Sequence, residues 1–352
     1  MMNIKFLFFL TRITGVLLAF FVSLGISNAA EGDNQQKEGI TWLRDFPIIL
    51  YFGESVVYKM NPLHENNLLR LHAAGVSILI TGNSVGKSNI RKFYSTIDRQ
   101  PIFNNFKIVY RLNQSLISYY QRNCRDTKEN CPAPSWLKET IEILKEYKNT
   151  AGYYVFDEPA QDHGKDGRVG RVSPNFQKLI YDSIRKIDPD KHKRPVINTN
   201  AAYQEGVDFS EISPYLSADF QDLILLQRYS TDVEKFTKDI SLWQSLDILS
   251  KVPHLPIYPA FIKQSNKTSN CNELELVAHF KKYGKWSIFP FEKAYVNSIN
   301  NFPGIIKAQG AAYFVYRVRE DYDWWKYLEM SACSEILDGA LKHARTIIKP
   351  KK

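Results

Sequence analysis

Two adjacent carboxylates follow an apolar run near the middle of the chain. The stretch "AGYYVFDEPAQDHG" (151–164) passes through aromatic and β-branched residues and ends on Asp157 and Glu158, before a proline. Like charges at the end of a buried strand repel each other, and burial also disfavours the charged form, so one carboxyl group is expected to have a raised pKa. A protonated carboxyl group beside an ionised one can carry out general acid–base chemistry.

The alternation of side chains along a β-strand predicts that these two carboxylates point to opposite sides. On that basis Glu158 shares its side with Tyr154 and Phe156, and Asp157 takes the other side. One carboxylate would then face a binding site, while the other braces a neighbouring strand or loop. The alternative is structural: "DEP" ends a strand, and its carboxylates pair with Arg111 or cap a helix.

The segments around this stretch predict how it is positioned. Short apolar runs alternate with helical segments from residue 47 onward, and such continuous apolar runs are typical of parallel strands covered on both faces. Capping residues predict helices that begin at 61–62, 135 and 173–174, and an inserted helix is expected near 273–282. The strands are expected at 47–53, 76–81, 107–112, 152–157, 195–200, 223–229, 256–262 and 311–317.

Eight strand–helix units in roughly 300 residues have the size and rhythm of a (β/α)8 TIM barrel, an α/β fold. We therefore predict a single barrel domain over residues 47–348. A doubly wound open sheet is the alternative, because a count of strands does not prove closure.

In a TIM barrel, functional groups lie at the carboxyl ends of the strands. Each predicted strand begins apolar and ends polar, which gives a mouth rich in hydrogen-bonding groups and suited to a polyhydroxylated ligand. The arginines could instead neutralise carboxylates, and the asparagines at 198 and 200 could cap a turn. The candidate ligand-binding residues are Glu54, Arg111, Asn113, Asn198, Asn200, Gln227, Tyr229, Gln264, Tyr316 and Glu320, with Thr81, Asn83, Lys263, Arg319 and Asp321 beside them.

Two tryptophans, Trp324 and Trp325, follow the eighth predicted strand in a loop. Tryptophan rings at a barrel mouth can stack on sugar rings, because each ring has a large apolar face and a polar edge. The alternative is that one ring of the pair packs inward.

Two stretches of the chain resemble glycoside-hydrolase-like TIM barrels. "GYYVFDEPA" (152–160) is similar to their fourth-strand motif, G-[WY]-Y-x-x-D-E-P, and "NNFPGIIKAQGAAYFVYR" (300–317) to their passage from helix seven to strand eight. The resemblance implies that Glu158 is the acid/base residue, with Asp157 beside it.

The resemblance also implies a nucleophilic glutamate at the end of strand seven. This chain reads "YPAFIKQS" (258–265) there, without a carboxylate. The missing glutamate would have to be replaced by another carboxylate: Asp157, Glu54, Glu320 or Glu292. The sequence thus predicts a glycoside hydrolase acting on a carbohydrate, with a catalytically silent glycan-binding barrel as the alternative.

The segment "ILITGNSVGKSN" (78–89) looks like a phosphate-binding loop, but its spacing is wrong. Such a loop needs four residues between its glycines, so that successive amides can cradle the phosphates. Three residues separate Gly82 from Gly86. We interpret the segment as a strand-to-helix loop, and a P-loop NTPase that depends on Lys87 is a third, less favoured hypothesis.

The N-terminus is typical of a secretory signal peptide over residues 1–29. It has a basic start, an apolar core that ends near Ile26, and small residues up to Ala29. A retained membrane anchor is the alternative, although Arg12 interrupts the apolar run. The sequence therefore predicts export to the periplasm or medium and no stable membrane insertion of the mature chain. Residues 30–46 are interpreted as a polar linker and 349–352 as a basic tail.

Four cysteines are consistent with an oxidising compartment. Cys124 and Cys131 bracket the polar loop "CRDTKENC" and could close it; Cys271 and Cys333 would then pair, although four cysteines allow three connectivities. The spacing and the scattered histidines do not suit zinc, so we predict no metal and no organic cofactor. The net charge of +9 lacks a dense basic run apart from the short tail, which argues against nucleic acid as a partner.

Overall fold

The computed structural model describes residues 40–45, 47–124, 131–159, 172–201, 213–227, 233–234, 236–238, 248–259, 261–263, 288–299, 311–316, 327–329 and 334–348. Residues 42–352 belong to one compact unit. The statements below concern the described residues of that unit.

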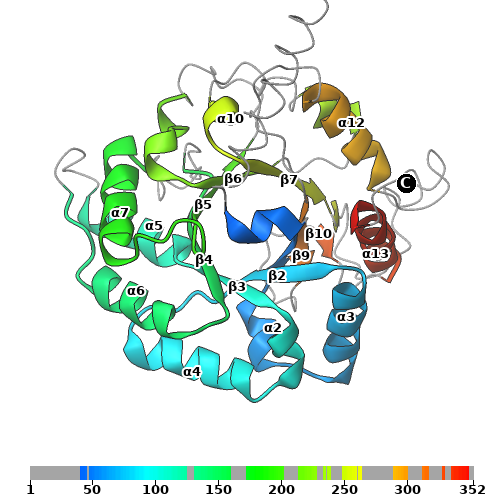
Figure 1. Ribbon diagram of the computed structural model, residues 1–352, viewed down its shortest axis with the longest axis horizontal. Coiled ribbons are helices and arrows are strands. Elements are labelled where there is room, and N and C mark those ends of the chain that lie inside the picture. Colours follow the sequence, from blue (N-terminus) through cyan, green and yellow to red (C-terminus); the bar gives the residue numbers. More distant parts are fainter. Residues whose placement is uncertain are drawn as a thin grey trace, which may run out of the picture. The chain divides into compact units, whose positions relative to one another are not determined.

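Eight parallel strands close into a barrel in the order β1-β2-β3-β4-β5-β6-β7-β9 (Figure 1). Closure is shown by β9, which pairs with β7 on one side and with β1 on the other. The (β/α)8 prediction is therefore confirmed, and the open sheet is excluded. The strands are β1 Ile48–Phe52, β2 Val76–Thr81, β3 Lys107–Arg111, β4 Thr150–Asp157, β5 Val196–Ala201, β6 Leu223–Gln227, β7 His254–Pro259 and β9 Ala311–Tyr316.

The predicted seventh strand, 256–262, is divided in the structure. Its last part belongs to β8 (Phe261–Lys263), which pairs antiparallel with β10 (Tyr327–Glu329) in a separate two-stranded sheet.

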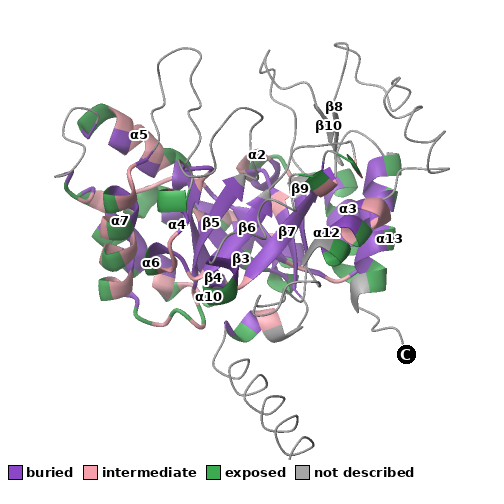
Figure 2. Cartoon of the chain, turned by 90° about the horizontal axis from the view of Figure 1, so that it is seen from above, coloured by how far each residue is buried: buried purple, intermediate pink, exposed green. Residues whose placement is uncertain are grey.

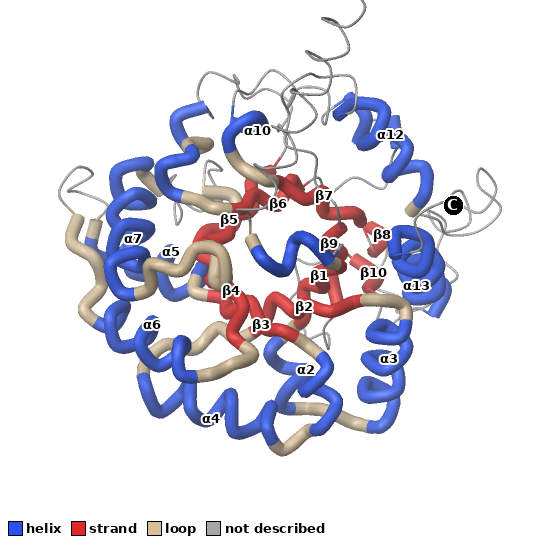
Figure 3. Tube along the Cα trace, viewed as in Figure 1, coloured by secondary structure: helices blue, strands red, loops and turns tan. Residues whose placement is uncertain are grey.

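Helices surround the ring of strands (Figure 3). Two of the predicted starts are capped by side chains: Asn61 accepts a hydrogen bond from the amide of His64, and Ser173 accepts one from the amide of Phe176. The predicted helix at 273–282 lies outside the described residues. The helices are α2 Glu54–Tyr58, α3 Pro62–Ala73, α4 Lys87–Asp98, α5 Asn113–Asn123, α6 Trp136–Glu146, α7 Pro174–Ile187, α10 Ile248–Lys251, α12 Phe289–Ile299 and α13 Ser334–Ile348, with short 3₁₀ turns η1 Thr41–Asp45, η2 Pro101–Asn105, η3 Ser213–Tyr215 and η4 Ala218–Phe220.

The strands are buried on both faces, whereas the helices expose their outer sides (Figure 2). On β1, alternate residues Ile48, Leu50 and Phe52 belong to the core shared with the helices. Tyr51 lies between them in the sequence and contacts a ring of β4 instead. The alternation therefore separates a helix-facing core from the barrel interior, as expected for apolar strands.

The regular alternation breaks in β4. Its register shifts between Tyr154 and Phe156. Phe156 contacts the ring of Phe176 on α7, at 6.2 Å between centroids, and so faces the helices. Tyr154 contacts Tyr51 in the barrel interior. The prediction that Glu158 shares one side with both residues is therefore wrong, because an irregularity of this kind reverses the parity beyond it.

The segment that looks like a phosphate-binding loop connects β2 to α4, as predicted for a strand-to-helix loop. Gly82 and Gly86 both have positive φ angles, of 80° and 89°, which glycine adopts without strain. Gly82 is further required because the ring of Tyr110 occupies the place of a Cβ atom.

The cysteine prediction is confirmed in its described half. Cys124 and Cys131 form a disulfide with a Cα–Cα separation of 5.2 Å. The predicted partners Cys271 and Cys333 lie outside the described residues. None of the helices in the described part of the chain combines the length and the hydropathy needed to cross a membrane.

Candidate active site at the carboxyl ends of the strands

Glu54 stands directly beyond β1 and begins α2. Its Oε1 atom accepts hydrogen bonds of 3.4 Å from the hydroxyls of Tyr58 and Ser84. Burial raises the pKa of Glu54, although the charge of Arg111 and these two hydroxyls oppose the rise. Burial and the neighbouring Glu54 raise the pKa of Tyr58 to about 12, so this tyrosine remains a hydrogen-bond donor at neutral pH.

Arg111 is the last residue of β3. Its guanidinium carbon is 4.9 Å from the centroid of the Tyr51 ring. Its charge lowers the pKa of Glu54, so Arg111 acts on a carboxylate of the mouth. The Nε atom of Arg111 and the Oδ1 atom of Asn113 are buried and have no hydrogen-bond partner among the described residues. Buried polar atoms of this kind normally have a partner, so both are suited to bind a ligand or water.

Three residues that the sequence analysis did not select form the floor of this site. Tyr51 on β1 and Tyr154 on β4 contact edge to face, with their centroids 5.8 Å apart. The Tyr154 hydroxyl is hydrogen-bonded to the hydroxyl of Thr199 on β5. The signal that could have identified them is polar and aromatic side chains at inward positions of apolar strands. Their contacts join β1, β4 and β5 across the interior.

Asp157 is the last residue of β4, and Glu158 directly follows it. Asp157 pairs in register with Thr199, and the Glu158 amide donates a 2.8 Å hydrogen bond to the Thr199 carbonyl. Glu158 is buried and has a φ angle of 49°, the positive-φ non-glycine residue of the described chain. Such backbone conformations carry strain and are concentrated at functional sites.

The asparagines predicted at the mouth hold strands and loops together. Asn198 accepts a 3.2 Å hydrogen bond from the Phe156 amide, next to the register shift of β4. Asn200 donates a 3.3 Å hydrogen bond to the side chain of Gln221. Both are buried, and they alternate with Thr199, which faces the interior.

The remaining predicted residues are described in part or not at all. Asn83 donates a hydrogen bond to Gln114, beside Asn113 at the start of α5. Gln227 and Tyr316 end β6 and β9. Glu292 lies in the first turn of α12 and contacts His343 of α13, in the helix layer. The predicted residues outside the described ones are Tyr229, Gln264, Arg319, Glu320, Asp321, Trp324 and Trp325.

Among the described residues, no group of three or more histidine, cysteine, aspartate or glutamate side chains could hold a metal ion. The side chains described at the site are carboxylates, hydroxyls, amides and one guanidinium, which can hold and transfer protons and bind hydroxyl groups.

Comparison with known proteins relates the chain to solved structures alone. No protein-family model matches it, and no curated protein is similar to it in sequence. An endo-1,4-beta-mannanase from Rhizomucor miehei has a TM-score of 0.54 at 12% identity, with 85% of this chain and 94% of that chain covered. A GH5_18 protein from Bifidobacterium longum subsp. infantis has a TM-score of 0.53 at 8% identity, covering 86% and 78%. A GH5-4 broad specificity endoglucanase from Clostridium longisporum has a TM-score of 0.52 at 10% identity, covering 88% and 99%. At these identities the similarity establishes a shared barrel fold.

Proposed function

We propose that this chain is an exported glycoside hydrolase, with Glu158 as the acid/base residue. The observation that carries the proposal is the placement of Glu158 and Glu54 at the carboxyl ends of two strands whose interior rings meet, Tyr154 of β4 and Tyr51 of β1. The shared fold with a mannanase and an endoglucanase supports it. A polysaccharide substrate would offer many hydroxyl groups to the polar mouth.

The proposed reaction needs two carboxyl groups. Protonated Glu158 donates its proton to the glycosidic oxygen as the bond between that oxygen and the anomeric carbon breaks. An ionised second carboxylate then either attacks the anomeric carbon or takes a proton from the water molecule that attacks it. The anomeric configuration of the first product, followed by NMR, distinguishes these two routes.

We propose that Glu54 is the second carboxylate. Glu292 is unsuitable because it contacts His343 in the helix layer. Asp157 adjoins Glu158 on the same strand, so a sugar could not lie between them. Glu54 instead follows β1, whose Tyr51 ring contacts Tyr154 of β4, and the hydroxyls of Tyr58 and Ser84 and the charge of Arg111 act on it. A sugar bound above these rings would have one carboxyl group on each side.

Arg111 and Asn113 are proposed to bind the hydroxyl groups of the sugar. Both have buried polar atoms without a hydrogen-bond partner among the described residues. Trp324 and Trp325 are proposed as the stacking platform, and no cofactor is required by this mechanism. Export is supported by the Cys124–Cys131 disulfide, since such bonds persist in oxidising compartments.

Incubation of the purified mature protein with a panel of β-mannans, β-glucans and mixed-linkage polymers tests the proposal. New reducing ends are the expected result, and they should be absent with the Glu158→Gln variant. A panel without any new reducing ends contradicts the proposal.

The Glu54→Gln variant is expected to change the pH profile and to keep the fold. The folded protein raises the pKa of Glu54 above the ordinary glutamate pKa of 4.5. As the pH is lowered, kcat/KM of the parent should therefore begin to fall at a pH above 4.5. The variant should be slow and should lack this acidic limb. A raised folded pKa means that ionised Glu54 destabilises the fold above that pKa, so the variant's melting temperature at pH 7 should be equal or higher by up to about 3 °C.

Rate profiles between pH 3 and 9, together with thermal melting, check this prediction. Ser77 lies before the site on β2, at the other end of the strand from Ser84, so Ser77→Ala is a suitable control. An acidic limb that persists unchanged in Glu54→Gln shows that another group ionises.

A catalytically silent glycan-binding barrel is the second candidate. The observation that favours it is the segment "YPAFIKQS" (258–265), which has no carboxylate where related barrels place the nucleophile. Calorimetric titration with oligosaccharides separates the two functions: sugar binding with no hydrolysis by the parent supports the silent barrel.

A further inference from the structure

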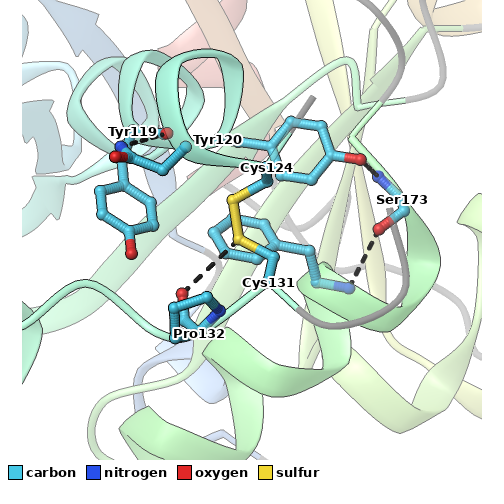
Figure 4. Close-up of a disulfide and its surroundings, with 8 residues drawn as sticks. Tyr119, Tyr120, Cys124, Cys131, Pro132 and Ser173 are labelled. Carbon is cyan, nitrogen blue, oxygen red and sulfur yellow. Dashed lines mark hydrogen bonds between the residues drawn. A yellow bond between two sulfur atoms is a disulfide. The ribbon is translucent and has the colours of Figure 1, made fainter. Parts of the chain in front are cut away.

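The disulfide lies at the C-terminal end of α5, a helix that packs against β4. Cys124 caps the end of α5, and Cys131 precedes the chain that leads into α6. Both cysteines are buried, and the Cys131 Sγ atom lies 3.6 Å from the carbonyl of Pro132 (Figure 4). A buried covalent link at this position fixes the C-terminal end of α5.

Tyr120 connects the fixed end of α5 to the start of α7. The Cys124 amide donates a 2.9 Å hydrogen bond to the Tyr120 carbonyl, so the two residues share the last turn of the helix. The Tyr120 hydroxyl accepts a 3.2 Å hydrogen bond from the Ser173 amide (Figure 4). The Tyr120 ring is buried and lies 4.9 Å from the ring of Phe176.

Ser173 and Val172 connect this contact to the end of β4. Ser173 caps α7 through the Phe176 amide. The Val172 amide donates a 3.0 Å hydrogen bond to the carbonyl of Pro159, which directly follows Glu158. The side chain of Gln177 donates a 3.0 Å hydrogen bond to the Val172 carbonyl. An unbroken series of contacts therefore runs from the disulfide to the peptide beside Glu158.

The backbone conformation of Glu158 has to be held in place by contacts of the neighbouring residues. Its φ angle of 49° lies in a region that a non-glycine residue adopts at a cost. Strained residues keep their conformation when the surrounding structure fixes them from several sides. Thr199 holds the amide of Glu158 on one side, and the Pro159–Val172 hydrogen bond holds the following residue on the other.

We propose that Tyr120 is a positioning residue for Glu158. Its contacts with Ser173, and those of Val172 with Pro159, connect the end of α5 fixed by the Cys124–Cys131 disulfide to the backbone next to Glu158. The expected effect of Tyr120 on catalysis rests on the proposed function, whereas the positioning of the Glu158 backbone does not. Reduction of the disulfide, in which a dithiol such as dithiothreitol is oxidised to its cyclic disulfide and two cysteine thiols form, should loosen the same contacts.

Hydrogen exchange on the full mature chain tests the positioning directly. In Tyr120→Phe, the amides of Glu158, Val172 and Ser173 should exchange roughly fivefold faster, as expected for the loss of one hydrogen bond. The double variant Cys124→Ser/Cys131→Ser should show the same local change. Tyr119→Phe is the matched control, because Figure 4 shows the Tyr119 hydroxyl pointing away from Ser173; its amides should exchange as in the parent.

Kinetics give the second readout. Tyr120→Phe should lower kcat by about tenfold with KM nearly unchanged, because misplacement of a catalytic group affects the chemical step more than substrate binding. Unchanged exchange at Glu158 and Val172 in both the Tyr120 and the disulfide variants overturns the proposal. Faster exchange over the whole chain also overturns it, since that result indicates global destabilisation. Faster local exchange in a protein whose parent hydrolyses nothing supports the positioning and contradicts the proposed function.

Discussion

Glu158→Gln is expected to lose most hydrolytic activity while the protein remains folded. The substitution keeps the size and hydrogen-bonding capacity of the side chain and removes its titrating proton. General acid–base catalysis of this kind contributes roughly 10²–10⁴-fold to rate, so kcat should fall by that factor. Binding of oligosaccharides should persist, because the sugar-binding groups proposed at Arg111 and Asn113 are unaffected.

The melting temperature of Glu158→Gln should stay within about 2 °C of the parent, since a conservative change without loss of volume is usually tolerated. Glu139→Gln, an exposed residue of α6, is the matched control and should be fully active. Two results would contradict the assignment. Hydrolysis by Glu158→Gln at the parent's rate shows that another residue donates the proton. Sugar binding without hydrolysis by either protein supports the silent barrel.

The barrel could be predicted from the sequence because its signals are local. Each strand is a short apolar run, and helices begin at residues such as Asn61 and Ser173 whose side chains accept a backbone hydrogen bond. The Cys124–Cys131 disulfide was also predictable, because only a short polar loop separates the two cysteines. Closure was not predictable from the strands themselves, since it depends on the pairing of β9 with β1 across most of the chain.

The details of the site depend on contacts between distant segments. The floor of the mouth joins Tyr51 to Tyr154, two residues about a hundred positions apart, so no local period could reveal it. The prediction of which side each β4 side chain faces was wrong for a similar reason. The register shift after Tyr154 is set by pairing with β5, where the Asn198 side chain accepts a hydrogen bond from the Phe156 amide. Sequence could thus place Glu158 at the end of a strand but could not say which way its neighbours point.

A buried ionic cluster holds the middle of β4, at Tyr153. Asp188 follows α7 and is 1% exposed. It accepts hydrogen bonds of 2.5 and 2.9 Å from the Nε and Nη2 atoms of Arg194, and one of 2.7 Å from the hydroxyl of Tyr153 on β4. Burial alone would raise the pKa of Asp188, but the hydrogen bonds from Arg194 and Tyr153 and the charges of Arg194 and Arg185 outweigh it and lower the pKa.

Asp188→Ala is expected to destabilise the fold strongly, because it leaves the Arg194 guanidinium and the Tyr153 hydroxyl without their acceptor. Removal of one partner from a buried ion pair typically costs about 3–5 kcal/mol, which corresponds to a fall in melting temperature of about 5–8 °C for a chain of this size. Asp182→Ala is the matched control on the same helix. Its exposed pair with Lys178, at 2.7 Å, should contribute less than about 1 kcal/mol.

The effect of Asp188→Ala should also depend on pH, in a direction that follows from the lowered pKa. A carboxyl group whose folded pKa lies below its ordinary value stabilises the fold fully above the ordinary value of 3.8, and this stabilisation is lost as the pH falls through the folded pKa. The difference in melting temperature between the parent and Asp188→Ala should therefore be constant from pH 5 to 8 and should shrink below about pH 4. Calorimetric melting across this range measures it. A variant that melts with the parent at pH 7, or a difference that grows as the pH falls, would show that the Asp188 cluster does not hold β4 in place.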